Sequence, residues 1–313
     1  MSIEQKPLVS IIMNCYNGEE FLNEALESIF SQTYPRFEVI FWDNRSIDNS
    51  AIIFKSKKDK RFKYFLAPKH TSLGEARNQA INKSVGELIA FLDCDDLWLP
   101  SKLEDQTPLF QKPTVGIVIC DTYYFNKKRV IKQLYKKNPP PTGKVFSELL
   151  TNYFISLETA MIRKDALKDL DEWFDSRFEV IEEFDLFVRI SFYWELEYVD
   201  KVLAKWRVHK KSLTWQKPEL FPFETDLFIG KIINHHPKIE IDYQNELNIL
   251  KANNSVDQAL IYWAKKDKKS AFKLIKKYLL KNKRATLVYL FIKIFGYKLF
   301  SSFMNLRRGI NGL

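Results

Sequence analysis

The sequence contains little cysteine, and two nucleotide-binding motifs are absent from it. Only three cysteines occur in 313 residues, and they form no CxxC pair, so neither a disulfide framework nor a thiolate zinc site is expected. The segment after the first apolar run has a single glycine, Gly18, where a GxGxxG dinucleotide-binding loop needs three, and no GxxxxGKS or GxxxxGKT phosphate loop occurs. These absences argue against a dinucleotide-dependent oxidoreductase and against a P-loop NTPase.

Long uninterrupted apolar runs are missing as well. The polar residues after Met1 predict no secretory signal peptide, and with the unpaired cysteines they favour a cytoplasmic protein. The most apolar stretch, residues 285–304, contains Lys293 and Lys298, which make a membrane-spanning helix costly. Its basic flanks favour a helix lying in the membrane interface. A helix packed on the domain or at a dimer contact is the alternative.

Positive charge is concentrated at the C-terminal end. Residues 251–313 contain 15 Lys and Arg but only two acidic residues, whereas the first 250 residues carry a small net negative charge. A membrane surface fits this segment better than nucleic acid, because its aromatic residues form apolar runs rather than spaced stacking positions. We therefore expect peripheral contact with the inner face of the cytoplasmic membrane and no nucleic-acid binding.

The first 125 residues alternate between strand-like and helix-like patterns. Runs rich in Val, Ile and Phe predict strands, and apolar positions three or four residues apart predict helices between them. Predicted strands span 9–14, 37–43, 62–67, 87–93 and 115–121, and predicted helices span 19–31, 49–58 and 74–84. This alternation is typical of a parallel sheet covered on both faces, with the ligand beyond the carboxyl ends of its strands.

The later sequence divides the chain further. A Lys- and Pro-rich stretch, 126–145, predicts an exposed excursion, and residues 182–192 and 196–206 predict a helix and a strand. From about residue 216 the pattern is helical and basic. We therefore expect one domain over residues 1–220 and a helical, basic extension over residues 221–313.

Three carboxylates follow the fourth predicted strand, at Asp93, Asp95 and Asp96. Crowded carboxylates repel one another, and burial increases the repulsion, so this arrangement calls for a compensating cation. A hard divalent ion such as Mg²⁺ or Mn²⁺, which also binds phosphate oxygens, would suit it. The alternative is that Asp95 or Asp96 caps a helix that begins near Pro100.

Four sequence blocks occur in order within about residues 8–105. They are VSIIMNCYNGEEFL at 9–22 with SIFSQTY at 28–34, FEVIFWDNRSIDNS at 37–50, GEARNQA at 74–80, and the DxD-like DCD at 93–95. In order and spacing they resemble the family-2 inverting glycosyltransferases. The resemblance implies a GT-A fold, which is a Rossmann-like α/β fold with a mixed sheet flanked by helices, and a nucleotide-sugar donor.

The resemblance also implies a donor site, formed by Tyr16, Asn17, Asp43, Arg77, Asp93 and Cys94. Tyr16 and Asn17 would line the pocket for the base, and Asp43 would accept hydrogen bonds from it. Arg77 would hold the base side or the phosphates, and Asp95 would bind the metal. Two alternatives stay open: Tyr16 as a packing residue and Arg77 as a surface ion pair. The chain has Asn44 and Arg45 where acidic and glycine residues commonly follow in the family.

Two later blocks complete the resemblance. VIEEFDLFVR at 180–189 resembles the segment that supplies the catalytic base, with Glu183 where the family usually has aspartate and Asp185 as the second candidate. An acidic helix start is the alternative. WRVHKKS at 206–212 resembles a block in which His209 would be an additional metal ligand or diphosphate contact, and Arg207 would pair with phosphate.

The combined hypothesis is a metal-dependent, inverting transfer of a sugar. By default the donor is a UDP-hexose or UDP-N-acetylhexosamine, and the acceptor is a cell-surface glycan or lipid-linked saccharide built at a bacterial inner membrane. An oligomer is compatible with this hypothesis. The alternative is a non-catalytic nucleotide-sugar-binding or membrane scaffold protein of the same fold.

Overall fold

The computed structural model describes residues 6–127, 129–209 and 216–294. The chain divides into two compact units: Met1–Leu149 with Tyr153–Val208, and Leu150–Asn152 with His209–Leu313.

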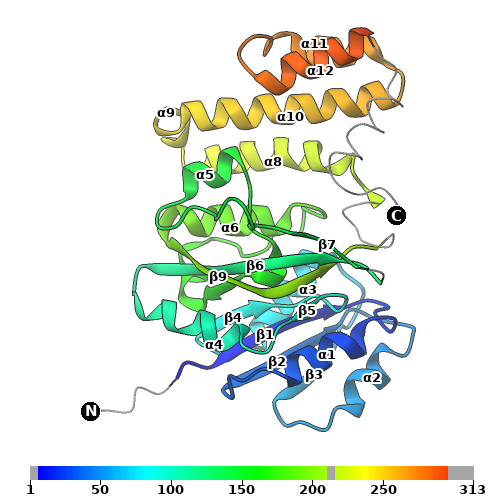
Figure 1. Cartoon of the computed structure of the whole chain (residues 1–313), viewed down its shortest axis with the longest axis vertical. Helices are drawn as coiled ribbons and strands as arrows, with labels where there is room; N and C mark the ends of the chain where they lie inside the picture. Colours follow the sequence, from blue (N-terminus) through cyan, green and yellow to red (C-terminus); the bar gives the residue numbers. More distant parts are fainter. Residues whose placement is uncertain (1–5, 128, 210–215, 295–313) are drawn as a thin grey trace. The chain divides into compact units, whose positions relative to one another are not determined.

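The strands, all drawn in Figure 1, are β1 (Val9–Cys15), β2 (Phe37–Asp43), β3 (Phe62–Leu66), β4 (Leu88–Phe91), β5 (Leu97–Trp98), β6 (Val115–Phe125), β7 (Val130–Gln133), β8 (Met161–Arg163) and β9 (Glu195–Arg207). The helices that precede residue 208 are α1 (Leu22–Phe30), α2 (Ser50–Ser56), α3 (Leu73–Asn82), α4 (Lys102–Gln106), α5 (Phe146–Thr151) and α6 (Glu182–Tyr193), with short 3-10 turns at Thr107–Gln111, Leu157–Thr159 and Lys164–Asp169.

The sheet of the first unit is mixed. Its strand order is β3-β2-β1-β4-β8-β6-β9-β5, with β7 paired to β6. The first four strands are parallel, as the alternating pattern predicts, whereas β8 runs antiparallel to both β4 and β6. The strands and helices predicted within the first 125 residues are confirmed, with differences only at their ends.

Alternating side chains of the central strands enter two separate apolar layers. Ile11 and Met13 of β1 belong to a cluster that includes the apolar face of α1, formed by Leu22, Ala25, Leu26 and Ile29. In the other layer the ring of Phe91 meets Phe174 and Phe187 edge-on, with centroids 5.8 and 6.2 Å away. All seven residues of β1 are buried, which explains why most of them are apolar rather than alternating with exposed polar residues.

The strand register brings distant polar residues to one edge. Cys15 lies opposite Asp43 in the β1–β2 pair, and Ile12 lies opposite Phe91 in the β1–β4 pair. The residues that follow β1, β2 and β4 therefore emerge together at the carboxyl ends of the strands. This is the edge at which the sequence predicts the ligand.

The sequence prediction lacks one strand. Residues 126–145 are largely exposed, as predicted, but β7 lies within them and pairs antiparallel with β6. The strand is short, alternates exposed and half-exposed side chains, and contains Lys132. Edge strands that carry lysine lack the apolar signal by which strands are recognised.

The second unit contains helices α8 (Leu220–His235), α9 (Ile239–Asp242), α10 (Gln244–Ala264), α11 (Lys268–Lys276) and α12 (Lys283–Ile294). Trp263 of α10, Ile275 of α11 and Val288 of α12 share one apolar cluster. The apolar stretch 285–304 begins in α12, and residues 295–304 lie outside the described residues. None of the helices in the described part of the chain is long and apolar enough to cross a membrane.

Candidate active site

Three carboxylates cluster directly after β4. Ligand oxygens of Asp93, Asp95 and Asp96 all lie within 4.8 Å of one another. Burial raises the pKa of Asp93 and raises that of Asp96 well above its ordinary range, and the charge of Asp95 adds to both effects. Three crowded oxygen ligands suit a hard divalent cation, because the cation would offset this repulsion. The cluster thus contains Asp93 and Asp95, which were predicted for the donor and metal site, together with the neighbouring Asp96.

Arg77 ties this cluster to another element. Its guanidinium is buried in α3 and donates to both carboxylate oxygens of Asp93 at 3.2 Å. It also donates to Glu182 Oε1 at 2.6 Å, at the start of α6. The alternative of a surface ion pair is therefore wrong, since the arginine side chain is almost fully buried. The predicted donor contact of Arg77 stays a prediction.

Glu183 follows Glu182 in the first turn of α6, so the acidic helix start is also present. Its side chain is half-buried. Burial and the neighbouring charge of Glu182 raise the pKa of Glu183 well above its ordinary value, with Arg77 opposing the rise. A carboxylate with a raised pKa is suited to accept a proton near neutral pH.

Asp185, the second candidate base, has a different environment. It is completely buried, and its carboxylate accepts two hydrogen bonds from Arg189, at 2.5 and 3.1 Å. Arg189 in turn donates to the carbonyl oxygens of Glu172 and Trp173. Because an enclosed ion pair cannot readily reach a substrate, the geometry favours Glu183 over Asp185 as the base.

The end of β9 lies against the carboxylate cluster. Arg207 donates its backbone N–H to Asp96 Oδ1 at 2.7 Å, and its side chain donates to the Asp95 carbonyl at 2.7 Å and to Glu24 at 2.8 Å. Arg207 therefore fixes the backbone of the acidic loop to β9 and α1. His209, the other predicted metal ligand, is two residues farther along the chain and is not one of the three clustered residues. Its role stays a prediction.

The residues predicted to hold the base follow β1 and β2. Tyr16 is 51% exposed, and its ring centroid lies 4.3 Å from that of His70. The predicted alternative of a packed Tyr16 is therefore not favoured. Asn17, in the left-handed region at φ 55°, accepts from the backbone N–H of Ile47 at 2.9 Å.

Asp43 is buried and already bonded within the protein. It accepts from the Tyr64 hydroxyl at 2.7 Å and from the backbone N–H of Ser46 at 2.7 Å. These bonds fix the carboxylate at the end of β2, where it was predicted to meet the base. Cys94, the remaining predicted donor residue, is partly exposed between Asp93 and Asp95.

Two polar groups near this site were not identified from the sequence. Glu158 is buried, accepts from Ser156 Oγ at 2.7 Å, and has no hydrogen bond to Oε1 from any described residue. The Tyr153 hydroxyl is likewise buried without a partner among the described residues, and its ring lies 5.1 Å from that of Phe184. Neither belongs to a motif. No local signal in the sequence identifies either group, because only tertiary burial makes them unusual.

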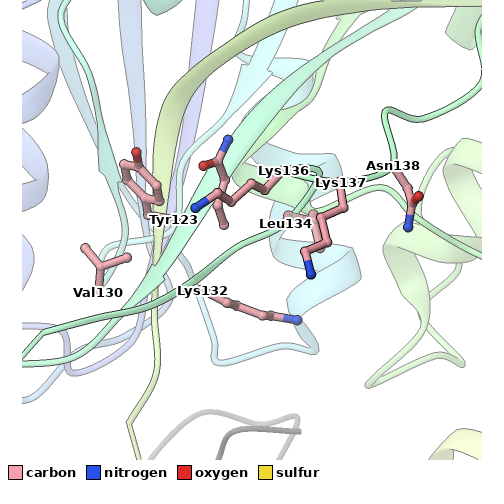
Figure 2. Close-up of a pocket in the computed structure, with 8 residues that line it drawn as sticks. Tyr123, Val130, Lys132, Leu134, Lys136, Lys137 and Asn138 are labelled. Atoms are coloured by element: carbon pink, nitrogen blue, oxygen red, sulfur yellow. The ribbon is translucent and has the colours of Figure 1, made fainter.

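A basic hollow of about 540 Å³ opens beside β7 (Figure 2). It is lined by Tyr123, Val130, Lys132, Gln133, Leu134, Lys136, Lys137 and Asn138. Lys132 Nζ lies 4.1 Å from the ring centroid of Tyr124. Burial raises the pKa of the Tyr124 hydroxyl, and the charges of Glu158, Glu183 and Asp96 add to that rise. Tyr124 therefore contacts Lys132 and is near enough to the carboxylates of the candidate site for their charges to act on its hydroxyl.

Comparison with known proteins gives a consistent result. The model of the family "Glycosyl transferase family 2" matches residues 10–171. An uncharacterised glycosyltransferase of Methanocaldococcus jannaschii is 29% identical over 217 residues, which are 66% of this chain and 73% of that protein. The UDP-Glc:alpha-D-GlcNAc-diphosphoundecaprenol beta-1,3-glucosyltransferase WfgD of Escherichia coli is 29% identical over 160 residues, which are 51% of this chain and 62% of the enzyme.

The fold also matches a solved structure. The crystal structure of S. aureus TarS 1–349 in complex with UDP-GlcNAc has a TM-score of 0.66 over 86% of this chain and 91% of that one, at 19% sequence identity. The mixed sheet flanked by helices and followed by a helical region is thus that of the GT-A glycosyltransferases, as expected from the sequence.

Proposed function

The chain belongs to glycosyl transferase family 2, and from this premise we propose that it transfers a sugar from a UDP-sugar to a lipid-linked saccharide or another cell-surface glycan. The observation that carries the proposal is the buried link from Asp93 through Arg77 to Glu182. It joins the loop of the acidic cluster to the first turn of α6, in which the proposed base Glu183 follows Glu182, and this supports the proposal. Donor phosphates and an acceptor hydroxyl need these two kinds of group close together.

The donor is proposed as a UDP-hexose or UDP-N-acetylhexosamine. Tyr16 and His70 form an exposed pair of rings beyond β1, suited to contact a base through its flat face. The E. coli relative is described as using UDP-Glc, which supports a UDP donor. Asn17, Asp43 and Cys94 complete the proposed donor site.

Asp93, Asp95 and Asp96 fit a bound Mg²⁺ or Mn²⁺, with His209 as a proposed additional ligand. When bound, the cation would neutralise the charge that builds up on the departing diphosphate. Arg77 keeps Asp93 oriented, and Arg207 holds the backbone carbonyl of Asp95 and the carboxylate of Asp96. The protein's contribution is therefore a fixed set of oxygen ligands.

The sugar would be transferred with inversion, by direct displacement. The acceptor oxygen attacks the anomeric carbon from the side opposite the diphosphate, the bond from that carbon to the diphosphate oxygen breaks, and the acceptor proton passes to the Glu183 carboxylate. Its raised pKa matches this task, because such a carboxylate holds a transferred proton at higher pH than an ordinary glutamate. Glutamate reaches one methylene farther than the aspartate usual in the family.

The acceptor is proposed to carry an anionic group close to the sugar that is modified. The relative in E. coli is described as acting on a diphosphate-linked acceptor. The hollow beside β7 is lined by Lys132, Lys136 and Lys137, and Lys132 lies over the ring of Tyr124. Ammonium groups of this kind bind phosphate as point charges.

We also propose peripheral contact with the inner face of the cytoplasmic membrane. One face of α12 packs inward through Ala285, Val288 and Ile292, while Leu287, Leu290 and Ile294 are 46%, 47% and 68% exposed. The exposed three follow helical spacing, and lysines lie at both ends of the helix. An exposed apolar stripe with basic flanks is typical of a helix in an anionic membrane interface.

The experiment is a donor panel. UDP-, GDP- and TDP-sugars are incubated with the full chain in Mn²⁺ and in chelator, and nucleotide release is measured. We expect metal-dependent turnover of one donor. Asp95→Asn should lower the rate of this turnover at least about a hundredfold, whereas the exposed control Asp165→Asn should retain it. If no donor is turned over and none binds at millimolar concentration, the scaffold alternative replaces the enzyme hypothesis.

A further inference from the structure

Two of the three cysteines lie side by side at the proposed donor site. β1 and β4 are parallel, with Ile12 opposite Phe91, so Cys15 at the end of β1 and Cys94 in the loop after β4 emerge at the same edge of the sheet.

Both sulfur atoms also lie against the same neighbour, Gly18. A β-carbon placed on Gly18 would lie 2.7 Å from Cys94 Sγ and 2.8 Å from Cys15 Sγ. Both are free cysteines. Only a glycine at position 18 therefore leaves room for both sulfur atoms.

The two thiols differ in exposure. Cys15 is 2% exposed, whereas Cys94 is partly exposed in the acidic loop. Cys94 is thus the thiol that a small oxidant can reach, and Cys15 is the neighbour placed to react with the product.

We propose that Cys15 and Cys94 are a peroxide-sensitive pair whose disulfide switches the donor site off. The Cys94 sulfur attacks one oxygen of hydrogen peroxide, the O–O bond breaks, and the other oxygen leaves as water, so that Cys94 becomes a sulfenic acid. The Cys15 sulfur then attacks the Cys94 sulfur, the S–O bond breaks, and a second water leaves. Two thiols are oxidised by two electrons, and one peroxide is reduced to two waters.

The effect of the bond follows from the position of Cys94. A disulfide draws the two sulfurs to about 2.05 Å, which pulls the loop toward β1. Cys94 lies between Asp93 and Asp95, whose oxygens must stay clustered to share a cation. Cys15 directly precedes Tyr16 of the proposed base pocket. The loss of donor binding rests on the proposed function, whereas formation of the disulfide does not.

The test uses the reduced full chain, treated with hydrogen peroxide and digested without reduction. Mass spectrometry is expected to find the Cys15 and Cys94 peptides joined and two of three thiols lost together, with the deeply buried Cys120 unchanged. The Cys120→Ser control should form the same bond, and Cys15→Ala should not. Oxidation of Cys94 without a link to Cys15, or links only between chains, would overturn the proposal.

The functional part is measured as Mn²⁺ and UDP binding before oxidation, after it, and after dithiothreitol. We expect affinity at least about tenfold weaker in the disulfide form, restored on reduction. Unchanged affinity in a fully disulfide-linked sample would overturn the switch. Donor turnover by the reduced protein is assayed separately, so failure of the proposed function is distinguished from failure of the thiol pair.

Discussion

Arg77 and Glu182 form a buried ion pair across 105 residues of sequence, with Arg77 Nη1 donating to Glu182 Oε1 at 2.6 Å. The same guanidinium donates through Nη2 to Asp93. One arginine therefore connects α3, the loop after β4 and the first turn of α6. The arginine binds Asp93, whose loop also contains Asp95 and Asp96, and Glu182, which directly precedes Glu183, and this makes Arg77 a positioning residue.

Replacing Arg77 should lower stability as well as activity. Arg77→Ala leaves Glu182 buried and without its partner, which costs about 3–5 kcal/mol in the free energy of unfolding. Urea unfolding measures this cost. The control is Lys168→Ala, which breaks the exposed Lys168–Asp165 pair and should change stability by less than about 1 kcal/mol. Equal stability of both variants would contradict the role given to Arg77.

Glu183 should set the acid limb of the pH–rate profile. Its pKa is raised above the ordinary value of 4.5, so it stays protonated, and inactive as a base, to a higher pH than a free glutamate. We expect kcat/KM to increase as pH rises through this raised pKa. Glu183→Gln should lower kcat by about 10²–10⁴-fold and abolish that limb.

The exposed neighbour Glu179 provides the matched control. Glu179→Gln removes a carboxylate close in sequence and should keep both the rate and the acid limb. If the pH–rate profile of Glu183→Gln keeps its acid limb, another group is the base. Asp185→Asn would then be the next variant to measure.

The sequence predicted the parallel part of the sheet because β1, β2 and β4 are buried on both faces and leave a continuous apolar signal. It also predicted the acidic cluster, since Asp93, Asp95 and Asp96 directly follow such a strand. β7 was missed because a short edge strand with an exposed lysine has no comparable pattern.

Pairings between distant residues could not be predicted from local patterns. The sequence indicated that Arg77 is functional but not that its partner is Glu182, because the pair depends on how α3 and α6 pack on the sheet. Glu158 was missed for a similar reason. Its carboxylate belongs to no motif, and only tertiary burial makes it unusual.

The lysine hollow should affect the acceptor and not the donor. Lys136→Gln/Lys137→Gln removes two exposed charges that form no ion pair with any described residue. Each exposed contact between a lysine and the anionic group contributes about 1 kcal/mol to acceptor binding. Loss of both contacts should therefore raise KM for a diphosphate-linked GlcNAc acceptor about tenfold or more, while KM for the donor stays the same.

The control for this experiment is Lys58→Gln, an exposed lysine on a distant part of the same unit. A second comparison uses an uncharged alkyl glycoside of GlcNAc, for which the double variant should behave as the unmodified protein. Equal loss with the charged and uncharged acceptors would show that the lysines do not recognise the anionic group.

The exposed face of α12 should determine binding to membranes. Leu287→Ser/Leu290→Ser removes two half-exposed apolar side chains but leaves the inward face of Ala285, Val288 and Ile292 intact. Because burying one leucine side chain contributes about 1.5–3 kcal/mol, co-sedimentation with phosphatidylglycerol vesicles should weaken at least about tenfold. Ile52→Ser, at an apolar residue of α2 that is more exposed than either leucine, should bind as the unmodified protein does. If the double variant still binds and only high salt releases it, the basic residues alone would account for the contact, and α12 would be a surface helix without a membrane role.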